Sequence, residues 1–253
     1  MFTAEIRVRL ALEADPDEIY GLLGCLRRNG QILGKEYAIA QTGRMLRVYA
    51  LVPEPNALHK SHDSRWVRES RRRLVEKGLT HLRVGIVGND PTSRNADTCS
   101  DPRDYILFTH YLTTGSPLRC GECFDPVPLY RVPPTCDKSK YYSVGTWESD
   151  YQACDTLQMN CSTGERFGIR EMSEADSSLS RRGRQLCADI EKSSGKPVYY
   201  YLLRYMKQTT TAKEEARSCP ICGGAWLLES PWHIFDFKCA ACRLVSTLSP
   251  TVA

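Results

Sequence analysis

The sequence CPICGG at residues 219–224 is matched downstream by CAAC at residues 239–242. A two-residue gap lets one tight turn present two thiolates to one ion, and a second turn at this separation completes a tetrahedral site. Residues 225–228 and 233–237 predict two β-strands separated by a turn at Ser230 and Pro231. The sequence therefore predicts a zinc ribbon, and its four ligands are Cys219, Cys222, Cys239 and Cys242.

Other uses of these four cysteines fit the sequence less well. A disulfide framework suits a secreted chain, but the N-terminus has charged residues where a signal peptide needs an apolar segment. A redox C-x-x-C site needs one pair rather than two at ribbon spacing. Because four thiolates close the coordination sphere, the predicted zinc stabilises the fold and does not catalyse.

The composition is that of a globular protein. The chain has 253 residues, of which 42% are hydrophobic and 25% charged, so we expect a sizeable core. No run approaches the roughly 18 apolar residues of a membrane span. Twelve cysteines without an export signal indicate reduced thiols and metal binding. We therefore expect a cytoplasmic protein that does not bind membranes.

The positive charge is unevenly distributed. The net charge of +4 is too small to indicate nucleic-acid binding by itself. Residues 60–83 contain eight basic and three acidic side chains, whereas basic and acidic side chains balance from residue 213 onward. The excess charge therefore lies outside the predicted ribbon.

Residues 1–90 predict a ferredoxin-like domain. Residues 3–12 alternate as in a half-buried strand, and Asp15-Pro16 begins a helix whose apolar residues recur at helical spacing. Two strands at about 34–41 and 44–52, a helix at about 60–77 and a strand at 79–87 follow. This order, βαββαβ, is that of the ferredoxin-like split βαβ arrangement.

The helix at 60–77 provides candidate nucleic-acid contacts. Arg65, Arg68 and Arg72 fall on one face, as a stripe that binds phosphates would. The alternative is a solvated helix face, in which Arg65 pairs with Glu69 and Arg72 pairs with Glu76. The spacing alone favours the solvated face.

Residues 104–207 predict a mixed α/β middle region with a third C-x-x-C pair, Cys120 and Cys123. These two thiols could be ligands of a second metal, packed core thiols or a redox pair. A second metal site would need further ligands, for which the candidates are Cys136, Cys154, Cys161 and Cys187. A polar segment then leads into the ribbon, which we place at 213–253. The fold class predicted for the whole chain is α+β.

Several stretches between Cys120 and the C-terminus resemble a bacterial family of proteins described as containing a zinc ribbon and as candidates for nucleic-acid binding. The stretches that carry the resemblance are CGECFDPVPLYRVPP, WESDYQACDTLQMNC, GRQLCADIE, KPVYYYLLRY, CPICGG and WHIFDFKCAACRLVS. The resemblance implies the same four zinc ligands, Cys219, Cys222, Cys239 and Cys242.

The sequence favours a non-enzymatic binding protein. It contains no H-E-x-x-H motif, nucleophile elbow or phosphate-binding loop. We expect nucleic acid to bind through the ribbon and the basic helix. The alternative is an immunity or inhibitor protein that binds and masks a protein partner such as a toxin, since that role needs surface complementarity and no catalytic group. The sequence leaves the oligomeric state open.

Overall fold

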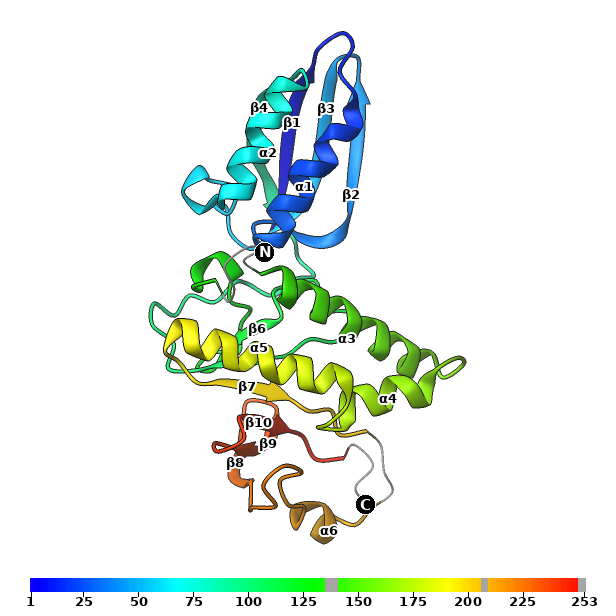
Figure 1. Ribbon diagram of the computed structural model, residues 1–253, viewed down its shortest axis with the longest axis vertical. Helices are drawn as coiled ribbons and strands as arrows, with labels where there is room; N and C mark the ends of the chain where they lie inside the picture. Colours follow the sequence, from blue (N-terminus) through cyan, green and yellow to red (C-terminus); the bar gives the residue numbers. More distant parts are fainter. Residues whose placement is uncertain (135–140, 206–208, 250–253) are drawn as a thin grey trace. The chain divides into compact units, whose positions relative to one another are not determined.

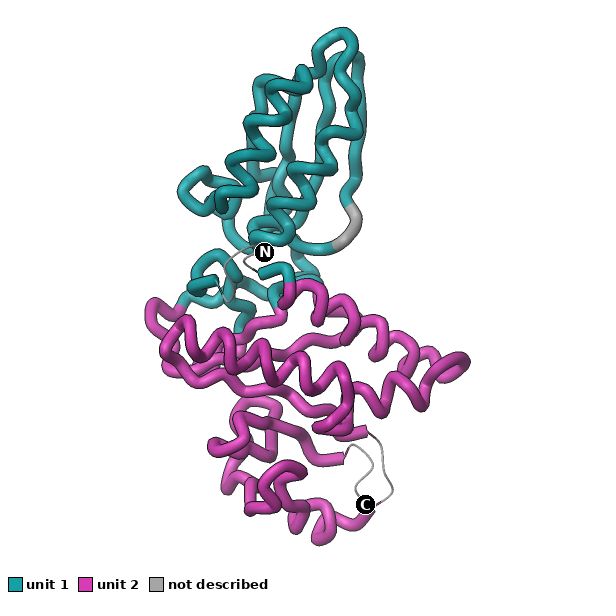
Figure 2. The backbone as a smooth tube through the Cα atoms, viewed as in Figure 1, with its two compact units in different colours: residues 1–98, 114–116, 125–142 teal, residues 99–113, 117–124, 143–253 magenta. Residues whose placement is uncertain are grey.

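The computed structural model describes residues 1–134, 141–205 and 209–249, apart from the side chains at positions 35 and 36. The chain forms two compact units (Figure 2). Unit 1 consists of Met1–Thr98, Thr114–Ser116 and Asp125–Tyr142. Unit 2 consists of Cys99–Thr113, Pro117–Phe124 and Ser143–Ala253. Each unit therefore contains segments that are far apart in the sequence.

Unit 1 contains one antiparallel sheet with strand order β2-β3-β1-β4. Helices α1 and α2 both lie on the same face of this sheet (Figure 1). The elements are β1 (Phe2–Leu10), α1 (Ile19–Arg28), β2 (Leu33–Thr42), β3 (Met45–Val52), α2 (Arg65–Glu76) and β4 (Leu79–Asn89), with short 3-10 turns at Pro16–Glu18, Lys60–His62 and Leu129–Arg131.

The core of unit 1 lies between the two helices and the sheet. In β1, every second side chain from Ala4 to Leu10 is buried, which confirms the alternation seen in the sequence. In α1, the four apolar residues at helical spacing are buried, as predicted: Ile19, Leu22, Leu23 and Leu26. Local periodicity was sufficient here because each element faces the core on only one side.

Helix α2 buries a narrow apolar stripe. Val67 and Leu74 are buried, whereas the neighbouring Trp66 is 40% exposed. The guanidinium of Arg65 lies over the Trp66 ring at 4.4 Å from its centroid. Trp66 therefore lies at the surface against Arg65 and not in the core.

Unit 2 contains a six-stranded sheet with strand order β6-β5-β7-β10-β9-β8. Its strands are β5 (Tyr105–Leu107), β6 (Leu118–Cys120), β7 (Val198–Tyr201), β8 (Leu227–Trp232), β9 (Phe235–Cys239) and β10 (Leu244–Ser246). Its helices are α3 (Tyr142–Asn160, whose first residue belongs to unit 1), α4 (Glu165–Ser173), α5 (Ser178–Ser194) and α6 (Thr211–Glu215). Strand β10 runs parallel to β7, with Leu244 opposite Tyr200. The strands around the C-terminal cysteines therefore continue the sheet of the middle region.

Strand β7 lies inside the sheet of unit 2, between β5 and β10. Its tyrosines, Tyr199, Tyr200 and Tyr201, are all buried, so their rings pack in the core. Helix α5 packs so closely on β7 that a Cβ atom at Gly183 would lie 2.2 Å from Cε2 of Tyr200. Nowhere in the described part of either unit is a helix long and apolar enough to cross a membrane.

Candidate metal centre

The four C-terminal cysteines converge on one point. The sulfurs of Cys219, Cys222, Cys239 and Cys242 all lie within 4.8 Å of one another. The Sγ atoms of Cys222 and Cys239 are 3.7 Å apart. In a tetrahedral zinc site with Zn–S bonds of about 2.3 Å, neighbouring sulfurs are about 3.8 Å apart. The spacing of these sulfurs thus fits a tetrahedral metal ion.

Two turns hold the cysteines in place. In the first, the Cys219 N–H donates to the Gly224 carbonyl and the Gly223 N–H donates to the Cys219 carbonyl, both at 2.9 Å. Gly223 has a φ of +70°, which residues other than glycine rarely adopt. In the second turn, Cys239 ends β9 and lies opposite Leu244 of β10. Each C-x-x-C pair is therefore fixed by backbone hydrogen bonds.

The thiols of this cluster differ in acidity. A hydrogen bond from the Gly224 backbone and, to a lesser extent, hydrogen bonds with the neighbouring thiols lower the pKa of Cys222 to about 7. Burial raises the pKa of Cys242 to about 12, and burial also raises that of Cys239. Four adjacent thiolates repel one another, so a bound cation is the group that would favour all four in the charged form.

A buried carboxylate supports the cluster from the side of helix α6. Glu214 accepts a hydrogen bond from Nε of Arg204 at 2.7 Å and forms an ion pair with Arg217 at 3.3 Å. The Arg217 guanidinium lies 4.2 Å from the centre of the Phe237 ring, and burial lowers its pKa to about 10. Arg217 and Glu214 thus anchor a segment that the sequence indicated to be a linker. The sequence did not reveal this contact, because nothing in the sequence distinguishes Glu214 from an exposed acidic residue.

A second group of cysteines lies elsewhere in unit 2. The sulfurs of Cys99, Cys120 and Cys123 lie within 4.8 Å of one another. Cys99 was not among the additional ligands that we expected, because it is a single cysteine in a polar loop. Of the expected ones, Cys136 lies outside the described residues.

Three further cysteines of unit 2 differ in exposure, since Cys154 and Cys187 are buried and Cys161 is exposed. Burial raises the pKa of Cys154 to about 11 and raises that of Cys187 still more. Cys161 is exposed and follows α3, where its thiol donates to the Gln158 carbonyl at 3.2 Å. Because metals bind the thiolate form, the two buried thiols act as small apolar side chains.

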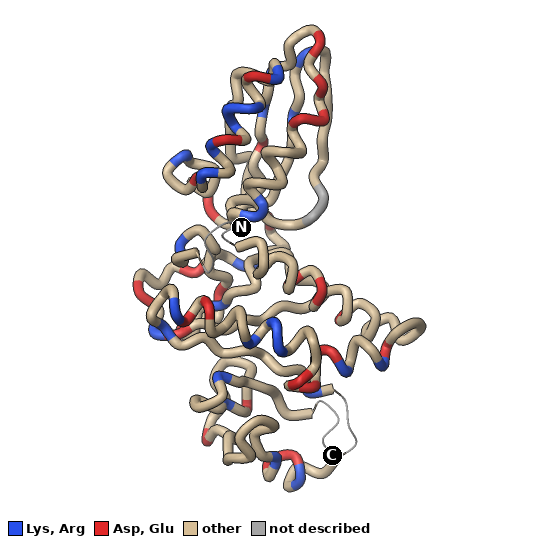
Figure 3. Tube along the Cα trace, viewed as in Figure 1, with Lys and Arg blue, Asp and Glu red and all other residues tan. Residues whose placement is uncertain are grey.

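The three arginines predicted to bind nucleic acid lie on the exposed side of α2, where basic and acidic residues are mixed (Figure 3). Arg65 stacks on Trp66, and Nη1 of Arg68 donates to the Asp63 carbonyl at 2.7 Å. Arg72 forms the expected ion pair with Glu76, at 3.2 Å. Contacts within the protein therefore engage all three side chains.

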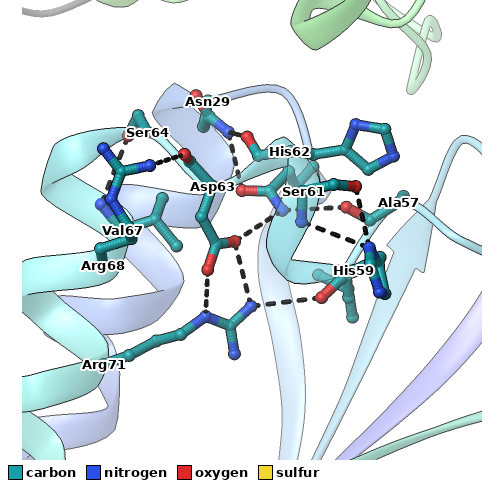
Figure 4. Close-up of polar contacts among 12 residues, drawn as sticks. Asn29, Ala57, His59, Ser61, His62, Asp63, Ser64, Val67, Arg68 and Arg71 are labelled. Carbon is teal, nitrogen blue, oxygen red and sulfur yellow. Dashed lines mark hydrogen bonds and ion pairs between the residues drawn. The ribbon is translucent and has the colours of Figure 1, made fainter.

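The loop before α2 is held by a buried polar network (Figure 4). The Asp63 carboxylate accepts hydrogen bonds from Nε of Arg71 at 2.7 Å and from Nε2 of Gln31 at 3.1 Å. Nη2 of Arg71 also donates to the Leu58 carbonyl at 3.2 Å. The Asp63 side chain is thus buried, and its contacts fix the start of α2.

The sheet face opposite the helices carries a group of arginines that the sequence did not single out. Arg7 in β1 lies opposite Arg47 in β3 and opposite Arg83 in β4. These three and Arg9, which alternation places on the same face of β1, are all exposed, and we call them the arginine row. Glu5 lies among them, 3.2 Å from Arg7 and 3.6 Å from Arg47. Like charges directly opposite in a sheet are destabilising, and the Glu5 carboxylate offsets part of this repulsion.

Models of three domains of unknown function match consecutive parts of the chain. DUF8589 matches residues 1–88, DUF2310 matches residues 99–203 and DUF8594 matches residues 208–252. Together they match most of the chain, in both units.

Two proteins of Haemophilus influenzae, each described as an uncharacterized protein, are similar to the chain. One is 34% identical over 259 residues, covering 98% of this chain and 98% of that protein. The other is 37% identical over 187 residues, covering 73% of this chain and 88% of that protein. The chain therefore belongs to the bacterial protein family that these two relatives represent.

Proposed function

We propose that the protein is a non-enzymatic zinc-binding protein whose C-terminal segment is a zinc ribbon. The observation that carries this proposal is the convergence of four sulfurs from two C-x-x-C turns within 4.8 Å. Thiolates favour zinc over the hard cations that prefer oxygen ligands. With four thiolates the coordination sphere is closed, so zinc would have a structural role.

We further propose that unit 1 is a ferredoxin-like domain and that it binds the phosphates of a nucleic acid. Strand order β2-β3-β1-β4 with both helices on one face is consistent with the ferredoxin-like assignment. Because both helices cover the same face of the sheet, the other face is available to a ligand, and that face carries the arginine row.

The arginine row is a better phosphate site than helix α2. It combines four arginines with one glutamate, Glu5, and it spans three neighbouring strands. On α2, Arg72 is paired with Glu76 and Arg68 is bound to a carbonyl. Arginine guanidinium groups bind phosphate through two parallel hydrogen bonds, so adjacent arginines suit a polyanionic backbone.

A binding titration with matched variants tests this proposal. The zinc-loaded protein is titrated with single- and double-stranded DNA and RNA at about 50 and 200 mM salt. We expect binding that weakens steeply with salt. The triple variant Arg7→Gln/Arg47→Gln/Arg83→Gln should bind more weakly and lower the salt slope by about 2 to 3, since each lost phosphate contact lowers it by about 1.

The helix provides the control. The variant Arg65→Gln/Arg68→Gln/Arg72→Gln removes the same charge from α2 and should retain most of the affinity. Loss of binding in the helix variant with retention in the sheet variant would place the contact on α2 instead. Absence of binding at low salt would overturn the nucleic-acid proposal and would leave masking of a protein partner as the better explanation.

A further inference from the structure

We propose that Cys99, Cys120 and Cys123 form a second metal site, which takes a thiophilic divalent cation such as zinc. This site is separate from the ribbon cluster, so either site can be present without the other. It lies in unit 2, where it would join the loop around Cys99 to the turn at residues 120–123.

The geometry of the three sulfurs fits one ion. All three lie within 4.8 Å of one another, compared with about 3.8 Å between sulfurs of a filled tetrahedral zinc site. Cys120 and Cys123 have the two-residue gap of the ribbon pairs, and the Glu122 N–H donates to the Cys120 sulfur at 3.4 Å. This N–H···S contact fixes the position of the Cys120 sulfur within the turn.

The turn between the two cysteines is held rigidly. The Gly121 N–H donates to the Asp104 carbonyl at 2.9 Å, and a Cβ atom at Gly121 would lie 1.7 Å from Oδ1 of Asp104. Only glycine therefore allows Asp104 to approach this closely. Phe124, which follows the turn, has a φ of +63°. The cysteines are thus positioned by the surrounding structure before any metal binds, which lowers the entropic cost of binding.

The ribbon hairpin contacts the same turn. The Gly121 carbonyl accepts a hydrogen bond from Nε1 of Trp232 at 2.9 Å and lies 2.7 Å from Nε2 of His233. The His233 ring stacks on Phe124, with 5.1 Å between the ring centres. Trp232 ends β8, and β9 leads from the same hairpin to the ribbon ligand Cys239. A metal at the second site would therefore hold the ribbon hairpin against the rest of unit 2.

Three thiolates provide three of the four ligands that a tetrahedral zinc ion takes, and each cysteine would lose its proton on binding. A redox function of the Cys120–Cys123 pair, by contrast, would not need a third thiol.

Metal content distinguishes the two sites. The full-length protein is loaded with excess zinc, passed over a desalting column and analysed for zinc and protein. We expect two zinc ions per chain in the wild type and one in Cys123→Ser. The ribbon variant Cys222→Ser should also retain one, at the second site. Cys161→Ser removes an exposed thiol of the same unit and should retain both ions.

Cobalt substitution gives a readout that needs no variant. Thiolate-to-cobalt charge-transfer absorption scales with the number of bound thiolates, so the wild type should show the intensity of seven thiolates rather than four. One zinc ion per chain in the wild type, or two in Cys123→Ser, would overturn the second site. Intensity for only four thiolates would do the same, even if Cys123→Ser fails to fold.

Discussion

At the scale of single residues, a buried charged side chain is held by several partners at the start of α2. Asp63 shows this most clearly, because its side chain is 1% exposed and receives bonds from both Arg71 and Gln31. A buried charge without its partner is strongly destabilising, whereas an exposed ion pair contributes little. The two kinds of pair occur side by side at α2, in Asp63–Arg71 and Arg72–Glu76.

Asp63→Asn should therefore destabilise the protein by about 3–5 kcal/mol, because it leaves the Arg71 charge buried without a counter-charge. Glu76→Gln is the matched control, and it should change the free energy of unfolding by less than about 1 kcal/mol. Denaturant unfolding of both variants measures the difference. Equal midpoints for the two variants would show that the Asp63 network does not stabilise unit 1.

At the scale of elements, close packing requires a glycine in one helix but not in another. Gly183 in α5 has no room for a methyl group, since Tyr200 and Nε1 of Trp147 would lie 2.2 and 2.7 Å from its Cβ. Gly145 in α3 has nothing within 4 Å of that position. The same substitution should therefore have opposite effects in the two helices.

Gly183→Ala should destabilise the protein by about 1–3 kcal/mol, the usual cost of overpacking a core. Gly145→Ala should stabilise it by up to about 1 kcal/mol, because alanine favours the helix and meets no neighbour. Thermal unfolding of both variants compares them. A stable Gly183→Ala protein would mean that α5 does not pack closely on β7.

Helix α5 is also tied to the strand region of the ribbon by an ion pair. Glu191 lies 2.9 Å from Arg243, which directly precedes β10. The hydrogen bond from Arg243 lowers the pKa of Glu191, although burial opposes this shift. The folded-state pKa is thus below the unfolded one, so the pair stabilises the fold above about pH 4.3 and less as the pH falls through the folded-state value.

Glu191→Gln should reduce stability at pH 7 by less than about 1 kcal/mol, since both side chains are about one-third exposed and solvent screens the pair. The difference from the wild type should shrink as the pH falls below about 4. Unfolding measured across this pH range checks both points. A difference that does not depend on pH would mean that the ion pair is not its source.

At the scale of the whole molecule, the metal ligands are concentrated in one unit. All four ribbon cysteines belong to unit 2, and their strands continue the sheet that contains β5, β6 and β7. Unit 1 has its own sheet and its own core. Metal bound to the folded chain stabilises the part that binds it, so its removal should act on unit 2.

Chelation of the metal should therefore increase amide hydrogen exchange in β5, β7 and β8–β10. Exchange in β1 and β3 should change little. Hydrogen exchange measured by mass spectrometry, with and without a chelator, follows both sheets in one experiment. An increase confined to residues 219–242 would instead mean that the ribbon loses its structure alone and that the shared sheet does not couple it to the middle region.

The sequence predicted those features that depend on only a few neighbouring residues. Alternation predicted β1, helical spacing predicted the buried face of α1, and the paired C-x-x-C turns predicted which C-terminal sulfurs would meet. In each case the information is local, because strand and helix periodicity and tight turns depend on neighbouring residues.

Only the tertiary structure decided which distant segments meet. The pairing of β7 with β10, the approach of Cys99 to Cys120 and the alignment of Arg7 with Arg47 and Arg83 all depend on contacts between remote parts of the chain. The segment at residues 125–142 likewise joins unit 1, where Leu129 packs against Gly30. Such contacts are selected by the packing of the whole unit, which no short stretch of sequence specifies.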